Sequence, residues 1–156
     1  MSGIWRNLLT LLAAVFSRDQ SVLKTGCSCT FLITPFDVGI SILKSDKYWQ
    51  LAESAQLDFG VRSGLIRRMR QVGCSLVNVT QNIQFHSPAR LFDKVNVQTT
   101  IVFADAKHIH FQHVYCVKGH VCATALVKGK FKVGRITQSA LELTGLTFAD
   151  KPSFLV

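Results

Sequence analysis

The sequence predicts a single α+β domain in which an antiparallel sheet wraps around one central helix. One segment carries apolar residues at helical spacing, and the segments before and after it alternate between apolar and polar residues. Short turns separate the alternating segments, as they do in an antiparallel sheet. The chain has 156 residues, of which 48% are hydrophobic and 17% charged. This balance argues against disorder and suits one domain with its own core.

The N-terminal segment Leu8–Phe16 is apolar and follows Arg6. It is far shorter than the roughly 20 residues that cross a bilayer, and no small-x-small cleavage site follows it. We expect an amphipathic helix that docks on the domain or on a neighbouring subunit, with weak contact to a membrane surface as the alternative. The predicted regions are an N-terminal helical extension (1–25), the main domain (26–134) and a C-terminal extension (135–156).

The first strand and the central helix follow this extension. Residues 27–34 alternate, and Pro35 ends the strand. We expect the helix to begin near Ser45, which can cap the free amide groups, with Asp46 in the first turn at the positive end of the helix dipole. Gly60 and Gly64 weaken the helix afterwards. Its apolar face is formed by Tyr48, Leu51, Ala52, Ala55 and Phe59.

Four alternating segments predict the rest of the sheet. In each of them, the first residue and every second residue after it are expected to share one face. Such alternation indicates a sheet with one buried face and one less buried face. The helix is too short to cover this sheet fully, so we expect a second subunit to cover the remainder. The segments are Val77–Phe85, Val95–Phe103, Ile109–Val117 and Val121–Val133.

The charge of the chain favours an anionic partner. Lys and Arg number 18 against 9 Asp and Glu, which gives a net charge of +9. Such an excess suits nucleic acid, a membrane surface or a phosphate-bearing ligand. The densest basic cluster, residues 67–70, is too short for a nucleic-acid-binding run, so we expect no nucleic-acid partner.

Cysteines and histidines indicate neither disulfides nor a metal site. The five cysteines form no CxxC pair, and their odd number suits reduced, mostly buried thiols in a reducing, cytoplasmic compartment. His108 and His110 share a strand face, but no further ligand stands at a suitable spacing. We therefore predict structural histidines and no metal.

Asp37 is the candidate catalytic carboxylate. It follows the first strand and precedes the loop into the helix, so it is expected to face the helix N-terminus near Lys44, Ser45 and Asp46. Amide groups there can hold a carbonyl oxygen as it becomes an oxyanion, while a carboxylate attacks the carbon or activates a water. The alternative is that Asp37 caps a turn.

Three segments carry a resemblance to a known family. The order of Asp37, a short loop and Tyr48 with Leu51-Ala52-Glu53 resembles the opening of 4-hydroxybenzoyl-CoA-thioesterase-like hotdog proteins. Residues 83–93 resemble the strand and Pro-containing turn of that family. Residues 105–113, DAKHIHFQH, resemble its thioesterase-superfamily-member-6-like branch. The resemblance runs from about residue 27 to residue 133.

This resemblance implies a hotdog fold, assembled as a homodimer or homotetramer, that hydrolyses an acyl-CoA thioester to free acid and CoA without a further cofactor. Asp37 matches the catalytic carboxylate, and Ser45 matches the position whose amide polarises the thioester carbonyl. Tyr48 matches an aromatic residue that packs beside the substrate. Many members carry Gly-His-x-Asn-Asn before the tyrosine, where this chain has Ser-Ile-Leu-Lys-Ser-Asp at residues 41–46. The gap from Asp37 to Tyr48 is also one residue longer than is usual in the family. Asp46 is therefore a rival carboxylate.

The basic residues gain a role from the same resemblance, because CoA phosphates bind cations. The candidate substrate-binding residues are Lys44, Tyr48, Arg90, Lys128 and Lys130. Lys128, Lys130 and Lys132 alternate, so they are expected to project together; a solvated face is the alternative reading. Two other functions remain open on this fold. One is non-catalytic binding of acyl-CoA or an acyl carrier protein. The other is a hydratase or dehydratase, which is disfavoured because no histidine lies between Cys27 and Phe85.

Overall fold

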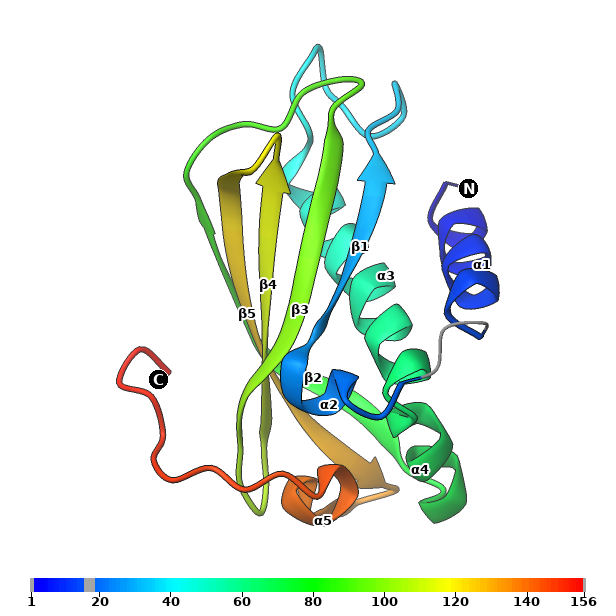
Figure 1. Cartoon of the computed structure of the whole chain (residues 1–156), viewed down its shortest axis with the longest axis vertical. Helices are drawn as coiled ribbons and strands as arrows, with labels where there is room; N and C mark the ends of the chain where they lie inside the picture. Colours follow the sequence, from blue (N-terminus) through cyan, green and yellow to red (C-terminus); the bar gives the residue numbers. More distant parts are fainter. Residues whose placement is uncertain (1, 16–18, 156) are drawn as a thin grey trace.

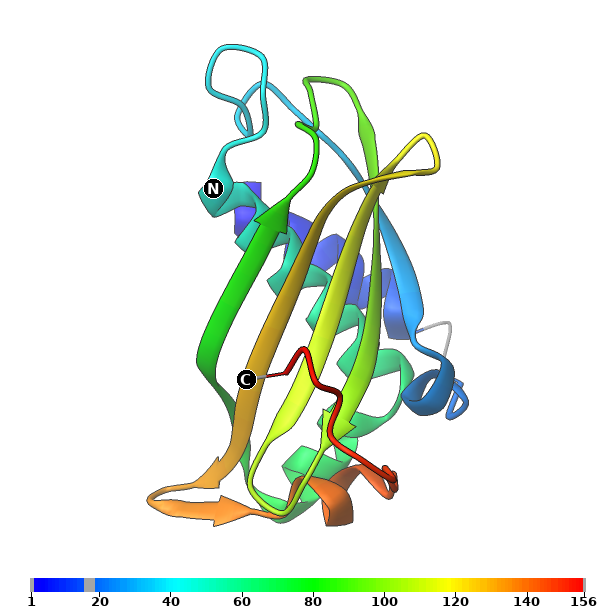
Figure 2. The same ribbon diagram turned by 90° about the vertical axis from the view of Figure 1, so that its left-hand side faces the viewer.

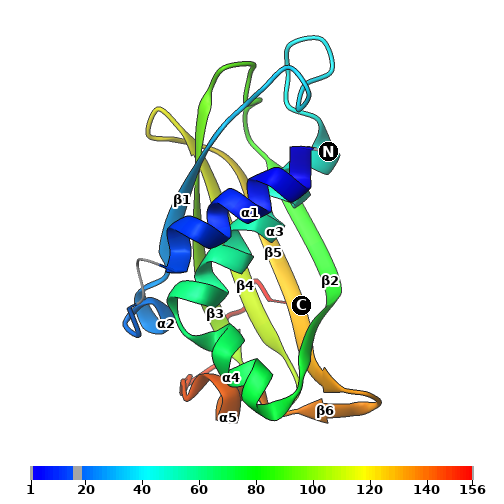
Figure 3. The ribbon, with the colours of Figure 1, turned by 90° about the vertical axis from the view of Figure 1, so that its right-hand side faces the viewer.

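The computed structural model, which describes residues 2–15 and 19–155, has a curled antiparallel sheet around one central helix (Figures 1 and 3). This is the hotdog fold, and it confirms the predicted fold class. The strand order is β1-β3-β4-β5-β2, and β6 pairs with β5. The elements are α1 (Ser2–Val15), α2 (Val22–Thr25), β1 (Cys27–Leu32), α3 (Ser45–Arg62), α4 (Leu65–Val72), β2 (Ser75–Phe85), β3 (Lys94–Ala104), β4 (Ile109–Val117), β5 (His120–Val133), β6 (Ile136–Gln138) and α5 (Ala140–Thr144).

Helix α3 fills the concave side of the sheet. Its predicted apolar face is buried, and the alanines at 52 and 55 let the helix lie close to the strands. Two details differ from expectation. The N-cap residue is Lys44 rather than Ser45, and no side chain caps the helix there. The helix also continues through Gly60 to Arg62. Glycine fits there because α4 packs so closely that a Cβ at this position would approach Ile66 to 2.9 Å.

The expected single face of β2 is wrong because a β-bulge interrupts this strand. The pairing with β5 shifts between Asn78 and Thr80. Before the bulge, Val77 pairs with Lys130, on the face away from α3. After it, Ile83 pairs with Ala125, on the core face. One extra residue at a bulge reverses the direction of every side chain that follows.

A second bulge changes the end of β3. Ile101 pairs with the buried Phe111, as expected, but the register then shifts and Phe103 pairs with His110. Phe103 therefore lies on the convex face, where its ring packs 5.7 Å from that of Phe148. Figure 2 shows the C-terminal segment of Phe148 running across this face.

The outer elements set the positions of the remaining surfaces. Helix α1 lies on the outer side of α3 (Figure 3). Strand β2 is an edge strand whose free side has no partner strand in the described structure. Of the described elements, α2, α4, β6 and α5 are additions that the periodicity did not predict. No helix within residues 2–15 and 19–155 has the length and hydropathy needed to cross a membrane.

Candidate functional site

Asp37 is held at the end of β1 by its own loop and by α1. Its carboxylate accepts hydrogen bonds from the Thr34 amide at 2.9 Å and from Thr34 Oγ1 at 2.6 Å. Arg6 of α1 places Nη2 at 3.0 Å from Oδ1 and 2.9 Å from Oδ2. The Asp37 side chain is fully buried, and that of Arg6 is 12% exposed. The carboxylate is thus enclosed by hydrogen-bond donors rather than open to a ligand.

The electrostatics of this pair keep Asp37 ionised. Burial by itself raises the pKa of Asp37, but hydrogen bonds from Thr34 and Arg6 and the charge of Arg6 outweigh burial. The net effect lowers the pKa below its ordinary value. The guanidinium also lies over the ring of Phe31, 5.9 Å from its centroid. Arg6 and Asp37 therefore form a charged contact between α1 and the β1–α3 loop.

The N-terminus of α3 lies beside the backbone of Asp37. The amide of Lys44 donates to the Asp37 carbonyl at 3.1 Å. The carboxylate bonds to Thr34 and Arg6, and it makes no hydrogen bond to the start of α3 in the described structure. Lys44, Ser45 and Asp46 are exposed at the start of the helix. A ligand can reach these three residues, and their functional role stays a prediction.

Tyr48 is part of the core at the same end of the helix. Its hydroxyl accepts a hydrogen bond from the Ala89 amide at 3.2 Å, and its carbonyl accepts one from the Tyr115 hydroxyl at 2.8 Å. The rings of Phe85 and Tyr115 meet it edge-on at 5.0 and 5.3 Å. This buried side chain fixes the start of α3 against the sheet.

The predicted phosphate-binding residues fall into two groups. Arg90 is exposed in the loop before β3, and its backbone forms a bridge with Ile42 close to the start of α3. Lys128 pairs with His110 on the convex face, and Lys130 follows it on the same face toward the other end of the strand. The predicted phosphate-binding cations therefore do not all lie at one site.

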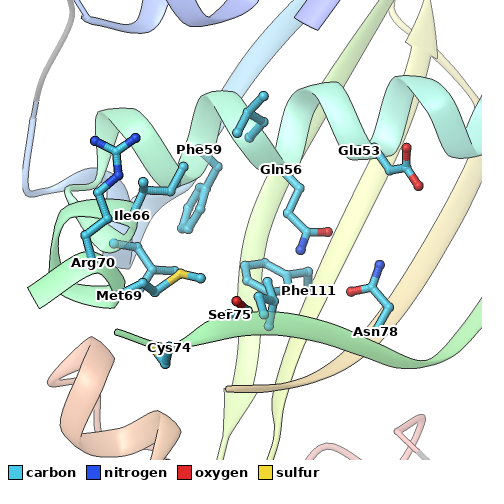
Figure 4. A pocket seen from close by; sticks show the side chains of 14 residues that line it. Glu53, Gln56, Phe59, Ile66, Met69, Arg70, Cys74, Ser75, Asn78 and Phe111 are labelled. Carbon is cyan, nitrogen blue, oxygen red and sulfur yellow. The ribbon is translucent and has the colours of Figure 1, made fainter. Parts of the chain in front are cut away.

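A pocket of about 390 Å³ opens between α3, α4 and β2 (Figure 4). Most of its wall is apolar, with Phe59, Ile66, Met69 and Phe111 among the lining side chains. Its volume lies in the range of small-molecule sites, roughly 300–1,000 Å³. β2 residues form one wall, so the pocket borders the free edge of the sheet.

Three polar side chains, those of Glu53, Gln56 and Asn78, line the same end of this pocket. Figure 4 shows Gln56 of α3 and Asn78 of β2 extending toward each other across the space between these elements. Glu53 lies one turn earlier on α3 and is exposed. A carboxylate and two amide groups beside an apolar wall can activate a water and bind an oxygen that gains negative charge.

The sequence reasoning missed Glu53 as a candidate site residue. The helical spacing placed it on the polar side of α3, with Ser54. In the structure these neighbours have different surroundings: Ser54 is buried and donates to Asn7 of α1, whereas Glu53 lines the pocket. The sequence signal that could have indicated Glu53 is its position as a carboxylate next to the apolar face of the central helix.

The histidines and cysteines contribute no metal site among the described residues. His113 is fully buried beside Thr99, whose Oγ1 lies 2.9 Å from the ring Nδ1. Burial lowers the pKa of His113 to about 4, so the ring is neutral. All five cysteines are free thiols, two of them buried and three half-buried.

Comparison with known proteins shows the family. The family model of the thioesterase-like superfamily matches residues 40–133, which is more than half of the chain. Comparison with curated proteins gives no significant match.

Several solved structures are similar to this chain. A probable thioesterase from Escherichia coli has a TM-score of 0.65 and 19% identity over 74% of this chain and 90% of that one. A 1,4-dihydroxy-2-naphthoyl-CoA thioesterase from Synechocystis has a TM-score of 0.61 and 18% identity over 72% of this chain and 86% of that one. A Staphylococcus aureus protein solved in complex with CoA has a TM-score of 0.68 and 16% identity over 76% of this chain and 78% of that one. At these identities the likeness shows the fold, and the family match shows that the chain belongs to the thioesterase-like superfamily.

Proposed function

We propose that this protein hydrolyses an acyl-CoA thioester to a free acid and CoA, in the pocket between α3, α4 and β2. The observation that carries the proposal is Glu53, an accessible carboxylate beside two side-chain amides at the end of an apolar pocket. Membership of the thioesterase-like superfamily supports the reaction class. The CoA bound to the Staphylococcus aureus neighbour supports CoA as the leaving group.

The chemistry needs one base and a group that binds an oxyanion. Glu53 accepts a proton from a water, whose oxygen attacks the thioester carbon. The carbonyl electrons move to the oxygen, which Gln56 and Asn78 stabilise through their amide N–H groups. When the intermediate collapses, the C–S bond breaks and the CoA thiolate takes the proton from Glu53. One water and one thioester thus give one acid and one thiol.

The pocket also sets the direction in which the substrate lies. The acyl group occupies the apolar part near Met69, and the thioester lies at Glu53. The pantetheine arm then extends toward the N-terminus of α3, where Lys44 and Arg90 are exposed. These cations are candidates to bind the phosphates of CoA. Lys128 and Lys130, on the convex face, are outside this path.

Asp37 has a different part in this proposal. While Arg6 and Thr34 enclose its carboxylate, it cannot reach a thioester. In this arrangement Asp37 positions the loop that precedes α3, and a direct catalytic role for it requires α1 to move away. Asp46 is exposed but lies about 10 Å along the helix from Glu53, at 1.5 Å per residue.

We further propose that the protein is a homodimer paired through β2. This edge strand exposes Val77 and Val79 to about half of their full extent, and an open apolar edge of this kind favours pairing with another strand. Residues 75, 76 and 78 of β2 line the pocket. A second subunit at this edge therefore borders the substrate site and limits its access to water.

The test is the release of free thiol from a panel of acyl-CoAs: short, medium and long aliphatic chains and one aryl ester. Wild type is compared with Glu53→Gln, Asp37→Asn and Asp46→Asn. We expect Glu53→Gln to lower kcat by about 100-fold or more, the usual contribution of a general base. We expect Asp46→Asn to stay within about twofold of wild type, since a surface charge this far from the thioester is largely screened.

A second candidate function is binding of acyl-CoA or an acyl carrier protein without turnover. The observation that favours it is the enclosure of Asp37, the residue that matches the catalytic carboxylate of the family. Calorimetry with a non-hydrolysable CoA thioether separates the two functions. Binding of the thioether without thiol release from any ester would support the binding protein and exclude the hydrolase.

A further inference from the structure

Helix α1 docks on the domain through its polar side chains. Arg6 pairs with Asp37, and Asn7 accepts a hydrogen bond from Ser54 of α3. Thr10 is buried on the same side, and its hydroxyl donates within α1 to the Arg6 carbonyl at 2.8 Å. The helix is therefore attached by specific polar contacts with the domain.

The opposite side of α1 is apolar and faces outward. A surface helix usually turns its apolar stripe toward the core and its polar side to water. Here the arrangement is reversed, because five large apolar side chains are each between 45% and 66% exposed. An exposed patch of this kind marks an interaction surface. We call Trp5, Leu8, Leu9, Leu12 and Val15 the outer stripe.

The charges around the outer stripe are mostly positive. Helix α1 contains no acidic residue, and Arg6 is already neutralised by Asp37. At the C-terminal end of α1, Val15 borders a surface depression lined by one carboxylate, Asp19, and by arginines that include Arg67 and Arg70 of α4. Both arginines are exposed, and neither forms an ion pair with any residue in the described part of the chain. The net charge of +9 has the same sign.

We propose that α1 binds the surface of an anionic lipid membrane through the outer stripe, while its polar side keeps the domain attached. A helix of 14 residues is about 21 Å long, shorter than the roughly 30 Å hydrocarbon core, and therefore lies in the plane of the interface. Trp5 sits at the headgroup level, where tryptophan is enriched. Arg67 and Arg70 face the anionic headgroups.

The charges favour a membrane over a second copy of this chain as the partner. In a two-fold symmetric dimer through the outer stripe, the same patch of both copies meets. If the two α1 helices run parallel, the unpaired Arg67 and Arg70 of both subunits lie at the same end of the interface and repel. If they run antiparallel, these arginines lie at opposite ends, and α1 of the partner offers them no acidic residue. Anionic headgroups neutralise the same arginines.

Co-sedimentation with vesicles tests this proposal on the full chain. One set of vesicles is phosphatidylcholine alone, and the other contains one third phosphatidylglycerol. We expect wild type to pellet with the anionic vesicles and to be released as NaCl is raised. The variant Leu9→Glu/Leu12→Glu is expected to lose at least about tenfold of the affinity for anionic vesicles, because it places two charges at the boundary between the headgroups and the acyl chains.

The matched control is Ile136→Glu on β6, away from α1 (Figure 3). Ile136 and Leu9 are equally exposed, at 66%, so the control adds a charge at a comparable surface site. It should bind anionic vesicles like wild type. Far-UV circular dichroism and urea unfolding verify that all variants fold.

Three results would overturn the proposal. The first is no pelleting with anionic vesicles, and the second is equal binding of the stripe variant and the control. The third is a lipid-free molar mass, measured by light scattering, that falls only in the stripe variant, which would assign the outer stripe to a second copy.

Discussion

Replacement of Arg6 by methionine isolates the contact that attaches α1 to the domain. The substitution keeps much of the aliphatic volume and removes the guanidinium. Asp37 is fully buried, so its carboxylate then remains in the interior with only Thr34 as a partner. Removal of one partner of a buried ion pair costs about 3–5 kcal/mol, because the other charge stays uncompensated. Since both hydrogen bonds from Thr34 remain, we expect the lower end, about 3 kcal/mol.

Urea unfolding followed by circular dichroism measures this loss. The double variant Arg6→Met/Asp37→Asn removes both charges and is expected to recover stability to within about 1–2 kcal/mol of wild type. Arg67→Met is the matched control, because Arg67 is exposed and without an ion pair in the described structure; its cost should stay below about 0.5 kcal/mol.

The pH dependence gives an independent reading of the same pair. The pKa of Asp37 in the folded protein is below its ordinary value of 3.8, so the pair stabilises the fold above that pH. This contribution is lost as the pH falls through the folded pKa. The difference between wild type and Arg6→Met should therefore shrink below about pH 4. A cost under about 1 kcal/mol at pH 7, or a double variant less stable than Arg6→Met, would refute the buried pair and with it the docked position of α1.

Three further predictions concern single side chains. Burial lowers the pKa of His113 from 6.5 to about 4, so on acidification the unfolded chain takes up a proton at this residue before the folded protein does. The free energy of unfolding should therefore fall by up to about 3 kcal/mol between pH 6.5 and 4. His113→Gln should lose this pH dependence, and an unchanged dependence would contradict the neutral, buried ring. Burial, with the neighbouring carboxylate, raises the pKa of Cys27 to about 12. Its alkylation by iodoacetamide at pH 8, followed by mass spectrometry, should be slow in the native protein and fast in urea; equal rates would contradict this. Arg90→Gln should raise KM for acyl-CoA about tenfold, whereas Lys128→Gln should leave it unchanged, and the reverse result would place CoA on the convex face.

The sequence supports prediction of the fold because its evidence is local. Alternation over four segments and one apolar helical stripe are enough to place an antiparallel sheet around α3. The bulges at Asn78 and Phe103 were not predictable, because each depends on how a strand pairs with its neighbour. The need for glycine at position 60 depends likewise on the close approach of Ile66 from α4. Such details come from tertiary contacts, which a single strand or helix does not encode.

The candidate site was less predictable for the same reason. The position of Asp37 at the end of a strand was correct, but its partner Arg6 is 31 residues away in sequence. The apolar stretch of α1 suggested a docking face, whereas the polar side chains attach the helix. Glu53 is identified only by a pocket that residues of α3, α4, β2 and β4 line together.

We propose above that this chain is a thioester hydrolase with Glu53 at its reacting centre. Thiol release from the acyl-CoA panel by wild type and Glu53→Gln, at equal folded concentration, tests it most directly. We expect turnover by wild type and a kcat lower by about 100-fold or more in the variant, with KM changed little. Equal turnover by both proteins would move the chemistry away from Glu53. Turnover by neither protein, with the CoA thioether still bound, would contradict the hydrolase itself.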